Sequence, residues 1–261
     1  MVGRELREYY PHRMAQLGHP VLEVKNISGN GDHNISFSLN QGEILGIAGL
    51  VGSGRTELVN LIYGTLPKDS GTVVIRGETV EIRSPRVAIT HGIGLIPEDR
   101  KFHGCILNAD VFFNINLSVF NKFSRRFMLD MKKMRATAED YSNKLSIRTP
   151  SLQQRVRNLS GGNQQKVVVA KTLAADTNIL IFDEPTRGID VGAKQEIYKL
   201  MVDLVEQGKS IIMISSEMEE LLGMSDRLIV LYEGRLMGEI PREKFKQSYV
   251  IELASGHPDL A

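Results

Sequence analysis

A glycine-rich segment, GLVGSGRT (49–56), places the strongest constraint on the fold. It follows the strand-like run EILGIAG (43–49) and precedes a helical pattern with Leu58, Leu61 and Ile62 on one face. Glycines let the backbone turn tightly, so that successive N–H groups can point at phosphate oxygens, and the positive N-terminal end of the following helix adds to the attraction. The sequence therefore predicts a strand–loop–helix unit that binds phosphate.

One position departs from the phosphate-loop pattern G-x-x-x-x-G-K-[ST], because Arg55 stands where lysine is expected. Arginine keeps the positive charge but is a planar fork on a longer stem, so we expect phosphate binding in weakened or displaced form. Taken alone, the segment is equally compatible with a glycine-rich turn that binds nothing. The predicted phosphate-binding residues are Gly49, Leu50, Val51, Gly52, Ser53, Gly54, Arg55 and Thr56, with the Thr56 hydroxyl placed on Mg²⁺.

Two further motifs carry chemistry. The apolar strand ILIF (179–182) ends in Asp183, expected to hold Mg²⁺ through water, and Glu184, expected to orient and polarise the attacking water. Alone, it would read as a buried strand capped by two solvated acids. Upstream, LSGGNQQK (159–166) places a serine and two glycines at the start of a helix, which makes an anion-binding end with exposed backbone donors.

Composition excludes several classes of function. Of 261 residues, 32 are Lys or Arg and 31 are Asp or Glu, so the net charge of +1 argues against nucleic-acid binding through a broadly basic surface. The one cysteine, Cys105, can form no internal disulfide and no metal cluster. No apolar stretch approaches the roughly 20 residues that span a bilayer, and the first twenty residues are too polar for a signal peptide. We therefore expect a soluble, cytoplasmic chain whose membrane role comes through a partner.

The pattern along the chain predicts the arrangement of elements. Residues 1–20 suggest a short charged helix and a loop, and residues 107–158 suggest a helical insertion with a long helix over 128–147. Strands alternating with amphipathic helices after the insertion indicate a largely parallel sheet covered on both faces. The expected strands are 21–27, 35–39, 43–49, 71–77, a strand within 92–100, 178–182, 210–215, 227–232 and 235–240, and the expected later helices are 162–174, 193–207 and 217–223.

Together, LSGGNQQK and ILIFDEPTRGID (179–190) resemble the ATP-binding cassette (ABC) family, and the resemblance spans about residues 21–240. It implies an α/β fold: a P-loop NTPase core of the ABC type, with an antiparallel β subdomain and a helical subdomain insertion. The implied organisation is a linker from a preceding domain (1–20), a first core part (21–103), the helical subdomain (104–158), a second core part (159–245) and a C-terminal tail (246–261).

The motifs PEDRK (97–101), DEPTRGIDVGAK (183–194) and ISSEMEELLGMSDR (214–227) further resemble the second half of tandem ATPases that power bacterial monosaccharide importers. MVGREL (1–6) is similar to the seam between the halves. This resemblance implies ATP and Mg²⁺ as cofactors and a cytoplasmic position, peripheral on the inner face of the plasma membrane. The implied partners are a second ABC nucleotide-binding domain (a first half or another copy), membrane permease subunits and, indirectly, a sugar-binding receptor, but no nucleic acid. The permease is expected to dock on residues 104–158, with residues 98–101 as the hinge of that subdomain.

Three positions depart from the family pattern. Arg55 replaces the lysine, Glu98 stands where a glutamine touches Mg²⁺ and water, and Ser216 stands where a histidine contacts the γ-phosphate. No aromatic residue lies within 21–34 to stack on adenine. The implied site residues outside the phosphate loop are Glu98, Ser160, Gly161, Gly162, Asp183, Glu184 as the catalytic residue, Asp190 and Ser216, with Thr56, Glu98 and Asp183 as metal ligands.

The positions that face a partner, namely Ser160, Gly161, Gly162 and Asp190, match the family pattern, as does Glu184. In this family two domains pack head to tail, and each ATP lies between the phosphate loop of one and the signature, the LSGGN segment, of the other. We therefore hypothesise a division of labour in which this signature completes a partner's site while the chain's own nucleotide site is slow or structural.

Two other classes of function stay open. A soluble ABC ATPase acting on DNA or ribosomes is disfavoured by the near-neutral charge and by the tandem-half motifs. A non-catalytic nucleotide-binding scaffold is kept open by the three departures in the chain's own site. The identity of a transported sugar cannot be read from these residues.

Overall fold

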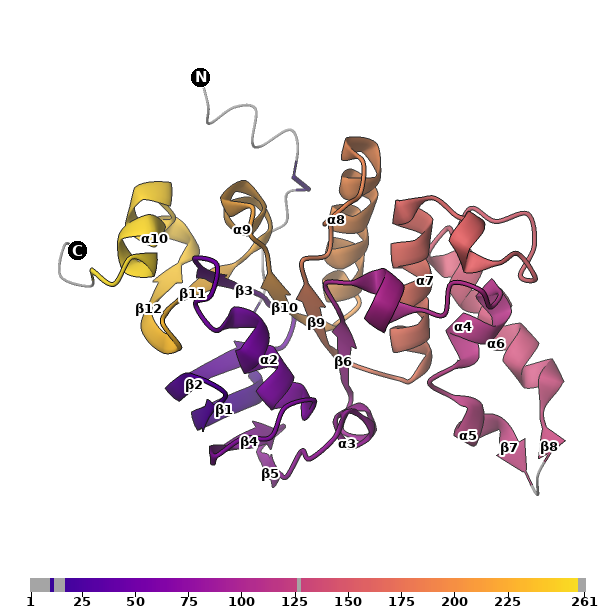
Figure 1. The fold of residues 1–261 in the computed structure, drawn as a ribbon, viewed down its shortest axis with the longest axis horizontal. Helices are drawn as coiled ribbons and strands as arrows, with labels where there is room; N and C mark the ends of the chain where they lie inside the picture. The colour runs from indigo at the N-terminus through magenta and orange to yellow at the C-terminus, as the bar shows by residue number, and fades with distance from the viewer. Residues whose placement is uncertain (1–9, 12–16, 126–127, 258–261) are drawn as a thin grey trace.

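The computed structural model describes residues 10–11, 17–125 and 128–257, and shows two sheets beside a group of helices (Figure 1). The helix expected near the N-terminus falls mostly outside the described residues. The larger sheet has the strand order β12-β11-β3-β10-β9-β6, and all neighbours in it are parallel except β11 and β12. Its strands are β3 (Ile44–Gly49), β6 (Ile93–Ile96), β9 (Ile179–Asp183), β10 (Ser210–Ile214), β11 (Arg227–Tyr232) and β12 (Arg235–Pro241).

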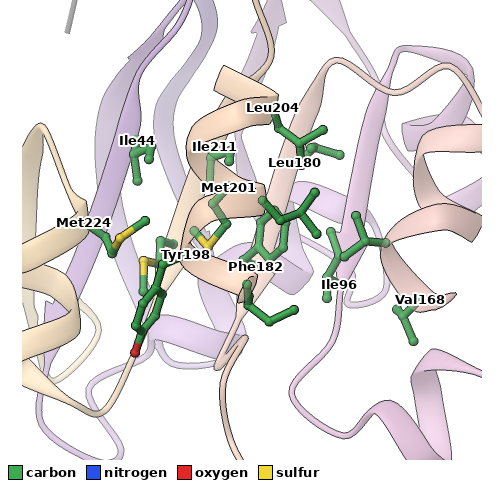
Figure 2. Packing of buried hydrophobic residues seen from close by; sticks show 14 of the residues in the cluster. Ile44, Ile96, Val168, Leu180, Phe182, Tyr198, Met201, Leu204, Ile211 and Met224 are labelled. Carbon is green, nitrogen blue, oxygen red and sulfur yellow. The ribbon is translucent and has the colours of Figure 1, made fainter. Parts of the chain in front are cut away.

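The central strands are buried along their whole length, because helices cover both faces of the sheet. Every residue of β9 and β10 is buried, which matches their continuous apolar sequences. One side of the sheet packs on the long helix α8 (Val191–Glu206) and the neighbouring α9 (Met218–Met224), around Phe182, Tyr198 and Met201 (Figure 2). The predicted, largely parallel sheet is confirmed.

The second sheet is the antiparallel subdomain, with the order β2-β1-β4-β5. Its strands are β1 (Pro20–Gly29), β2 (Asp32–Asn40), β4 (Ser70–Ile75) and β5 (Glu78–Val80). Helix α2 (Arg55–Tyr63) lies between the two sheets, and its predicted apolar face, Leu58, Leu61 and Ile62, is fully or almost fully buried in one cluster with residues of both. The helix that follows the phosphate loop is therefore anchored in a hydrophobic core shared by both sheets.

The insertion is mainly helical, as predicted. It contains α4 (Val111–Asn116) and α6 (Met131–Lys144), which lie against α7 (Gly161–Ala174) at one end of the molecule, and α5 (Phe120–Phe123), which contacts α6 (Figure 1). The expected helix over 128–147 starts later, because Met128–Leu129 form strand β8 opposite β7 (Ser124–Arg125), and Asp130 caps α6 by accepting a hydrogen bond from the Lys133 N–H. Val111 and Ile115 are fully buried, so much of this apolar run is core.

Several short elements are absent from the sequence-based prediction. They are α3 (Pro85–Thr90), a π-helical turn at Arg100–Gly104, the 3₁₀ turns Val156–Asn158 and Arg242–Lys244, and α10 (Gln247–Ala254). Helix α10 lies in the segment expected as a tail, where it buries Val250 and Leu253 against the core. Among the helices described, none combines the length and the apolar character that crossing a bilayer requires.

Candidate functional site

The phosphate loop connects β3 to α2 and borders a pocket of about 630 Å³. Gly52 (φ 82°) and Gly54 (φ 99°) adopt left-handed backbone conformations that favour glycine, so the loop makes the tight turn that its sequence predicts. The pocket also receives residues from the ends of β6, β9 and β10. The residues that line it are Val51, Gly52, Ser53, Gly54, Arg55, Thr56, Glu57, Glu98, Glu184, Thr186, Arg187, Gly188, Ile189, Lys194, Ser216 and Glu217.

Arg55 does not extend into the pocket as an unpaired cation. Its side chain is largely buried, and Nη1 donates a hydrogen bond of 2.8 Å to the backbone carbonyl of Ser215, just after β10. The guanidinium therefore ties the start of α2 to the neighbouring strand end. A lysine has one point charge on a flexible stem, whereas arginine's fork is already engaged in this contact.

Asp183 and Thr56 form the part of the site that suits Mg²⁺. Asp183 is 3% exposed, and its Oδ1 has no hydrogen-bond partner. Burial, and next the nearby Glu184, raise the pKa of Asp183 to about 6, while a hydrogen bond from Thr56 acts in the opposite direction. An orphaned carboxylate oxygen beside a hydroxyl fits the oxygen donors that Mg²⁺ prefers.

The other two departing residues are engaged with groups of the same pocket. Glu98 forms an ion pair with Arg187, so its carboxylate already has a cation as partner. Ser216 donates a hydrogen bond of 3.0 Å from Oγ to Oε2 of Glu184. Glu184 itself has φ 48°, an uncommon conformation for a residue other than glycine, which aims its carboxylate from the end of β9 into the pocket. The structure thus brings Glu98, Glu184 and Ser216 together with the phosphate loop in one pocket.

Behind this pocket lies a buried polar cluster that the sequence analysis missed. Glu220 is 1% exposed and accepts hydrogen bonds from Tyr198 Oη (2.6 Å), Ser215 Oγ (2.7 Å), Lys194 Nζ (3.2 Å) and the Thr186 hydroxyl. Burial raises the pKa of Glu220, but these hydrogen bonds outweigh it and hold the pKa below its usual value. The cluster fixes the segments after β9 and β10 relative to α8.

The signature forms the N-terminus of α7, and its geometry depends on its glycines. Ser160 is the N-cap and accepts a hydrogen bond of 2.8 Å from Asn163 Nδ2. A Cβ at Gly161 would lie 2.9 Å from Arg100 Nη2, and one at Gly162 would lie 2.8 Å from the Cβ of Ala193. None of Ser160, Gly161 or Gly162 is among the residues that line the phosphate-loop pocket. The exposed Ser160 therefore lies outside the pocket that the chain's own phosphate loop lines.

Asp190 is also placed outside that pocket. It caps α8, because its Oδ1 accepts a hydrogen bond of 3.0 Å from the Ala193 N–H, and its side chain stays at the surface.

Arg100, which the sequence placed only within the expected hinge at residues 98–101, connects the segment that lines the phosphate-loop pocket to the signature helix. Its Nη1 and Nη2 donate to the carbonyls of Arg187 (2.8 Å) and Gly188 (3.0 Å), and its Nε donates to Gln164 Oε1 of α7 (3.4 Å). One side chain thus joins the π-helical turn, the turn after Glu184 and the signature helix. Its place inside the charged motif PEDRK was the only signal of this role.

Comparison with known proteins agrees with this geometry. A sequence model described as "ABC transporter" matches residues 33–187, which is more than half of the chain. This chain belongs to the ABC transporter family.

Among the relatives of this ABC protein, a "Putative ribose/galactose/methyl galactoside import ATP-binding protein 2" of Rhizobium meliloti (strain 1021) is 48% identical over 98% of the chain. A "Ribose import ATP-binding protein RbsA" of Clostridium tetani (strain Massachusetts / E88) is 48% identical over 97%. The chain covers 50% and 51% of these two proteins, so it spans about half the length of the curated relatives it matches.

Solved structures support the ABC fold. The protein resembles a nucleotide-free ATP-binding cassette from an ABC transporter with a TM-score of 0.78 and 20% identity, over 90% of this chain and 98% of the other. It resembles a dimeric cassette in a post-hydrolysis state, bound to ADP and Pi, with a TM-score of 0.72 and 22% identity, over 86% of this chain and 100% of the other. The predicted ABC-type fold is confirmed.

Proposed function

We propose that this ABC domain is the C-terminal nucleotide-binding half of a bacterial monosaccharide importer, in which binding and hydrolysis of ATP drive transport. Relatives named as ribose and galactose import ATP-binding proteins, about twice as long as this chain, support the proposal. The motifs PEDRK and DEPTRGIDVGAK support the assignment to the second half.

One observation carries the proposed division of labour: the groups of the chain's own site are engaged with one another, while its signature lies outside the pocket that they line. Arg55 is held by Ser215, and Ser216 by Glu184. Ser160, by contrast, is exposed at the N-terminus of α7. In the proposed assembly this end of α7 points at the ATP held by the phosphate loop of a first half.

The proposed chemistry of the signature follows from its geometry. The N-terminus of α7 offers backbone N–H groups and the positive end of a 14-residue helix to a phosphate. The Ser160 hydroxyl can donate a hydrogen bond to the same anion while its oxygen accepts the hydrogen bond from Asn163 Nδ2. These donors are fixed before the ATP arrives, and such preorganised groups stabilise the charge that develops during phosphoryl transfer.

The chain's own site is proposed to bind ATP and Mg²⁺ weakly. Thr56 and Asp183 would hold the ion, which supplies charge neutralisation on phosphate oxygens when bound. Glu184 is the general base or water-orienting group of this site, and its hydrogen bond from Ser216 holds the carboxylate in place. Glu98 is proposed as a third contact to the metal only after its ion pair with Arg187 opens.

The proposed partners are a second ABC nucleotide-binding domain, permease subunits that dock on the helical subdomain (104–158) and, indirectly, a sugar receptor. The proposed location is the cytoplasmic face of the plasma membrane.

A single-turnover ATPase assay tests the division of labour. The chain alone is expected to hydrolyse ATP slowly, and addition of the first half is expected to restore turnover. Brisk hydrolysis by the chain alone, abolished by Glu184→Gln, would contradict the division. Binding of ATP without turnover in the assembled pair would favour a scaffold instead.

A further inference from the structure

A buried aspartate lies directly against the phosphate loop and has no role in the site described so far. Asp32, the first residue of β2, is 1% exposed, and neither of its carboxylate oxygens has a hydrogen-bond partner. A Cβ on Gly54 would lie only 2.0 Å from Asp32 Oδ1, so this carboxylate is in close contact with the backbone of the loop. An unpartnered carboxylate at such a position is unusual and calls for an explanation.

Asp32 is held in place by contacts among the β1–β2 turn, the β11–β12 turn and the phosphate loop. The His33 N–H, next to it in β2, donates to the Gly234 carbonyl at 2.7 Å. The Gly234 N–H in turn donates to the Ser53 carbonyl in the phosphate loop at 3.0 Å. A Cβ on Gly234 would lie 2.0 Å from the Gly31 carbonyl oxygen, so the turns are in tight contact. The side chain therefore stays beneath the loop instead of turning out to water.

The electrostatic consequence is unfavourable for a bound anion. A phosphate loop attracts phosphate through backbone N–H dipoles, and a fixed carboxylate in contact with that backbone opposes a second negative charge. Burial, and next the charge of Glu57, raise the pKa of Asp32 to about 7. Hence the carboxyl is mostly neutral below pH 6 and mostly ionised at pH 8.

We propose that Asp32 is a charge-dependent brake on this chain's own phosphate loop: when ionised it weakens binding of a nucleoside triphosphate, and when protonated it releases that restraint. Together with Arg55, it would make the chain's own site the weaker one of the assembly. The inference concerns only this loop, so it is independent of whether the signature serves a partner.

Glu57 is the charged side chain that acts on Asp32, and it adds to the larger effect of burial on the pKa of Asp32. The charged and titratable residues on the segments next to Asp32 are His33 of β2, Arg55 and Glu57 of α2, and Tyr232, Glu233 and Arg235 at the β11–β12 turn.

The test measures binding of Mg²⁺–AMP-PNP to the full chain by equilibrium dialysis at pH 6 and pH 8. The variants are Asp32→Asn, which removes the charge and keeps the shape, and Asp32→Ala, which removes the charge and leaves space. Asp69→Asn is the control, because it removes the same charge from an exposed carboxylate before β4. Comparing variants at each pH cancels the titration of the ligand itself.

We expect Asp32→Asn and Asp32→Ala to bind on the order of tenfold more tightly than the wild type at pH 8, and nearly as the wild type does at pH 6. The control should match the wild type at both values. Equal affinity of wild type and both Asp32 variants at pH 8 would overturn the proposal. A gain of the same size at both pH values, or no binding by Asp32→Asn at either, would overturn it as well.

The stability of the free chain gives an independent reading. A carboxyl group whose pKa is raised from 3.8 to about 7 on folding stabilises the fold below pH 4, and this stabilisation is lost as the pH rises toward 7. The unfolding constant of Asp32→Asn, relative to the wild type, should therefore fall at least tenfold between pH 4 and pH 7 and then level off. A ratio that does not change with pH would show that Asp32 carries no shifted charge beneath the loop.

Discussion

The two helix N-termini proposed to bind anions, the start of α2 and the start of α7, differ in what surrounds them. At α2 the cation of Arg55 is engaged with the Ser215 carbonyl, and the unpartnered carboxylate of Asp32 lies against the loop. At α7 the cap Ser160 is exposed, and the atoms nearest to a Cβ built on Gly161 belong to the Arg100 guanidinium and the Gly188 carbonyl. The same secondary structure thus stands in two different electrostatic surroundings, because neighbouring side chains decide the charge balance at each helix end.

The largest effect on the ATPase rate is expected when a negative charge is introduced at Ser160 of the signature. Ser160→Asp and Ser160→Asn both keep an N-cap acceptor for α7, but only aspartate adds a negative charge opposite the partner's phosphate. In the assembled ATPase we expect Ser160→Asp to lower the turnover rate 10²–10³-fold, and Ser160→Asn to lower it far less. Steady-state hydrolysis measures both. Equal losses of turnover in the two variants would show that the charge at the start of α7 does not determine the ATPase rate.

Removal of the buried carboxylate behind the phosphate-loop pocket should destabilise the fold. Glu220→Ala leaves Lys194 and three hydroxyl groups without their common acceptor, so the free energy of unfolding should fall by about 3 kcal/mol. The neighbouring Glu219→Ala, at an exposed position, should change it by no more than about 0.5 kcal/mol. Urea titration measures the difference, and similar values for the two variants would contradict the role of the cluster.

Arg100 is expected to couple the turn after Glu184 to the signature helix α7. Arg100→Ala removes the hydrogen bonds to the Arg187 and Gly188 carbonyls, so the signature helix loses its link to the turn after Glu184. We expect about a tenfold lower ATPase rate in the assembled protein, with stability lowered by about 1 kcal/mol. Lys101→Ala, at the exposed next position, is the control. If Arg100→Ala lowered the ATPase rate no more than Lys101→Ala does, Arg100 would not couple the two segments.

The smallest effect is expected in the chain's own catalytic residue. Because its phosphate-loop site is proposed to turn over slowly, Glu184→Gln should lower the rate of the assembled ATPase by no more than about twofold. The equivalent change in the partner half should lower it by 10² or more. Comparable losses for the two halves would mean that both sites hydrolyse ATP.

Features carried by contiguous residues could be predicted from the sequence. The phosphate loop, β9 with its two acids and the capped start of α7 each depend on a short run of residues with its own turn and cap chemistry. The mixed sheet architecture followed from apolar strands that alternate with amphipathic helices. Helix α10 was missed because it follows the last expected strand, in a segment taken as a tail, and its N-cap, Lys246, is not one of the Ser, Thr, Asp or Asn residues that mark a helix start.

Contacts between distant segments could not be predicted in the same way. The hydrogen bond from Arg55 to Ser215 joins residues 160 apart, and that from Arg100 to Arg187 joins residues 87 apart. Asp32 reads in the sequence as an ordinary polar residue of a glycine-rich turn, and only the packing of three turns buries it. Which charges are free and which are engaged is a property of tertiary structure.

Disulfide cross-linking tests most directly whether the signature serves a partner's ATP. The native Cys105 is buried and is the one cysteine of the chain, so a cysteine replacing Ser160 can be paired with another in the phosphate loop of the first half. With Mg²⁺–ATP and a hydrolysis-deficient first half, we predict a fast cross-link between the two that is lost without nucleotide. A cross-link that forms equally well without ATP, or none with ATP bound, would contradict the proposed role of the signature.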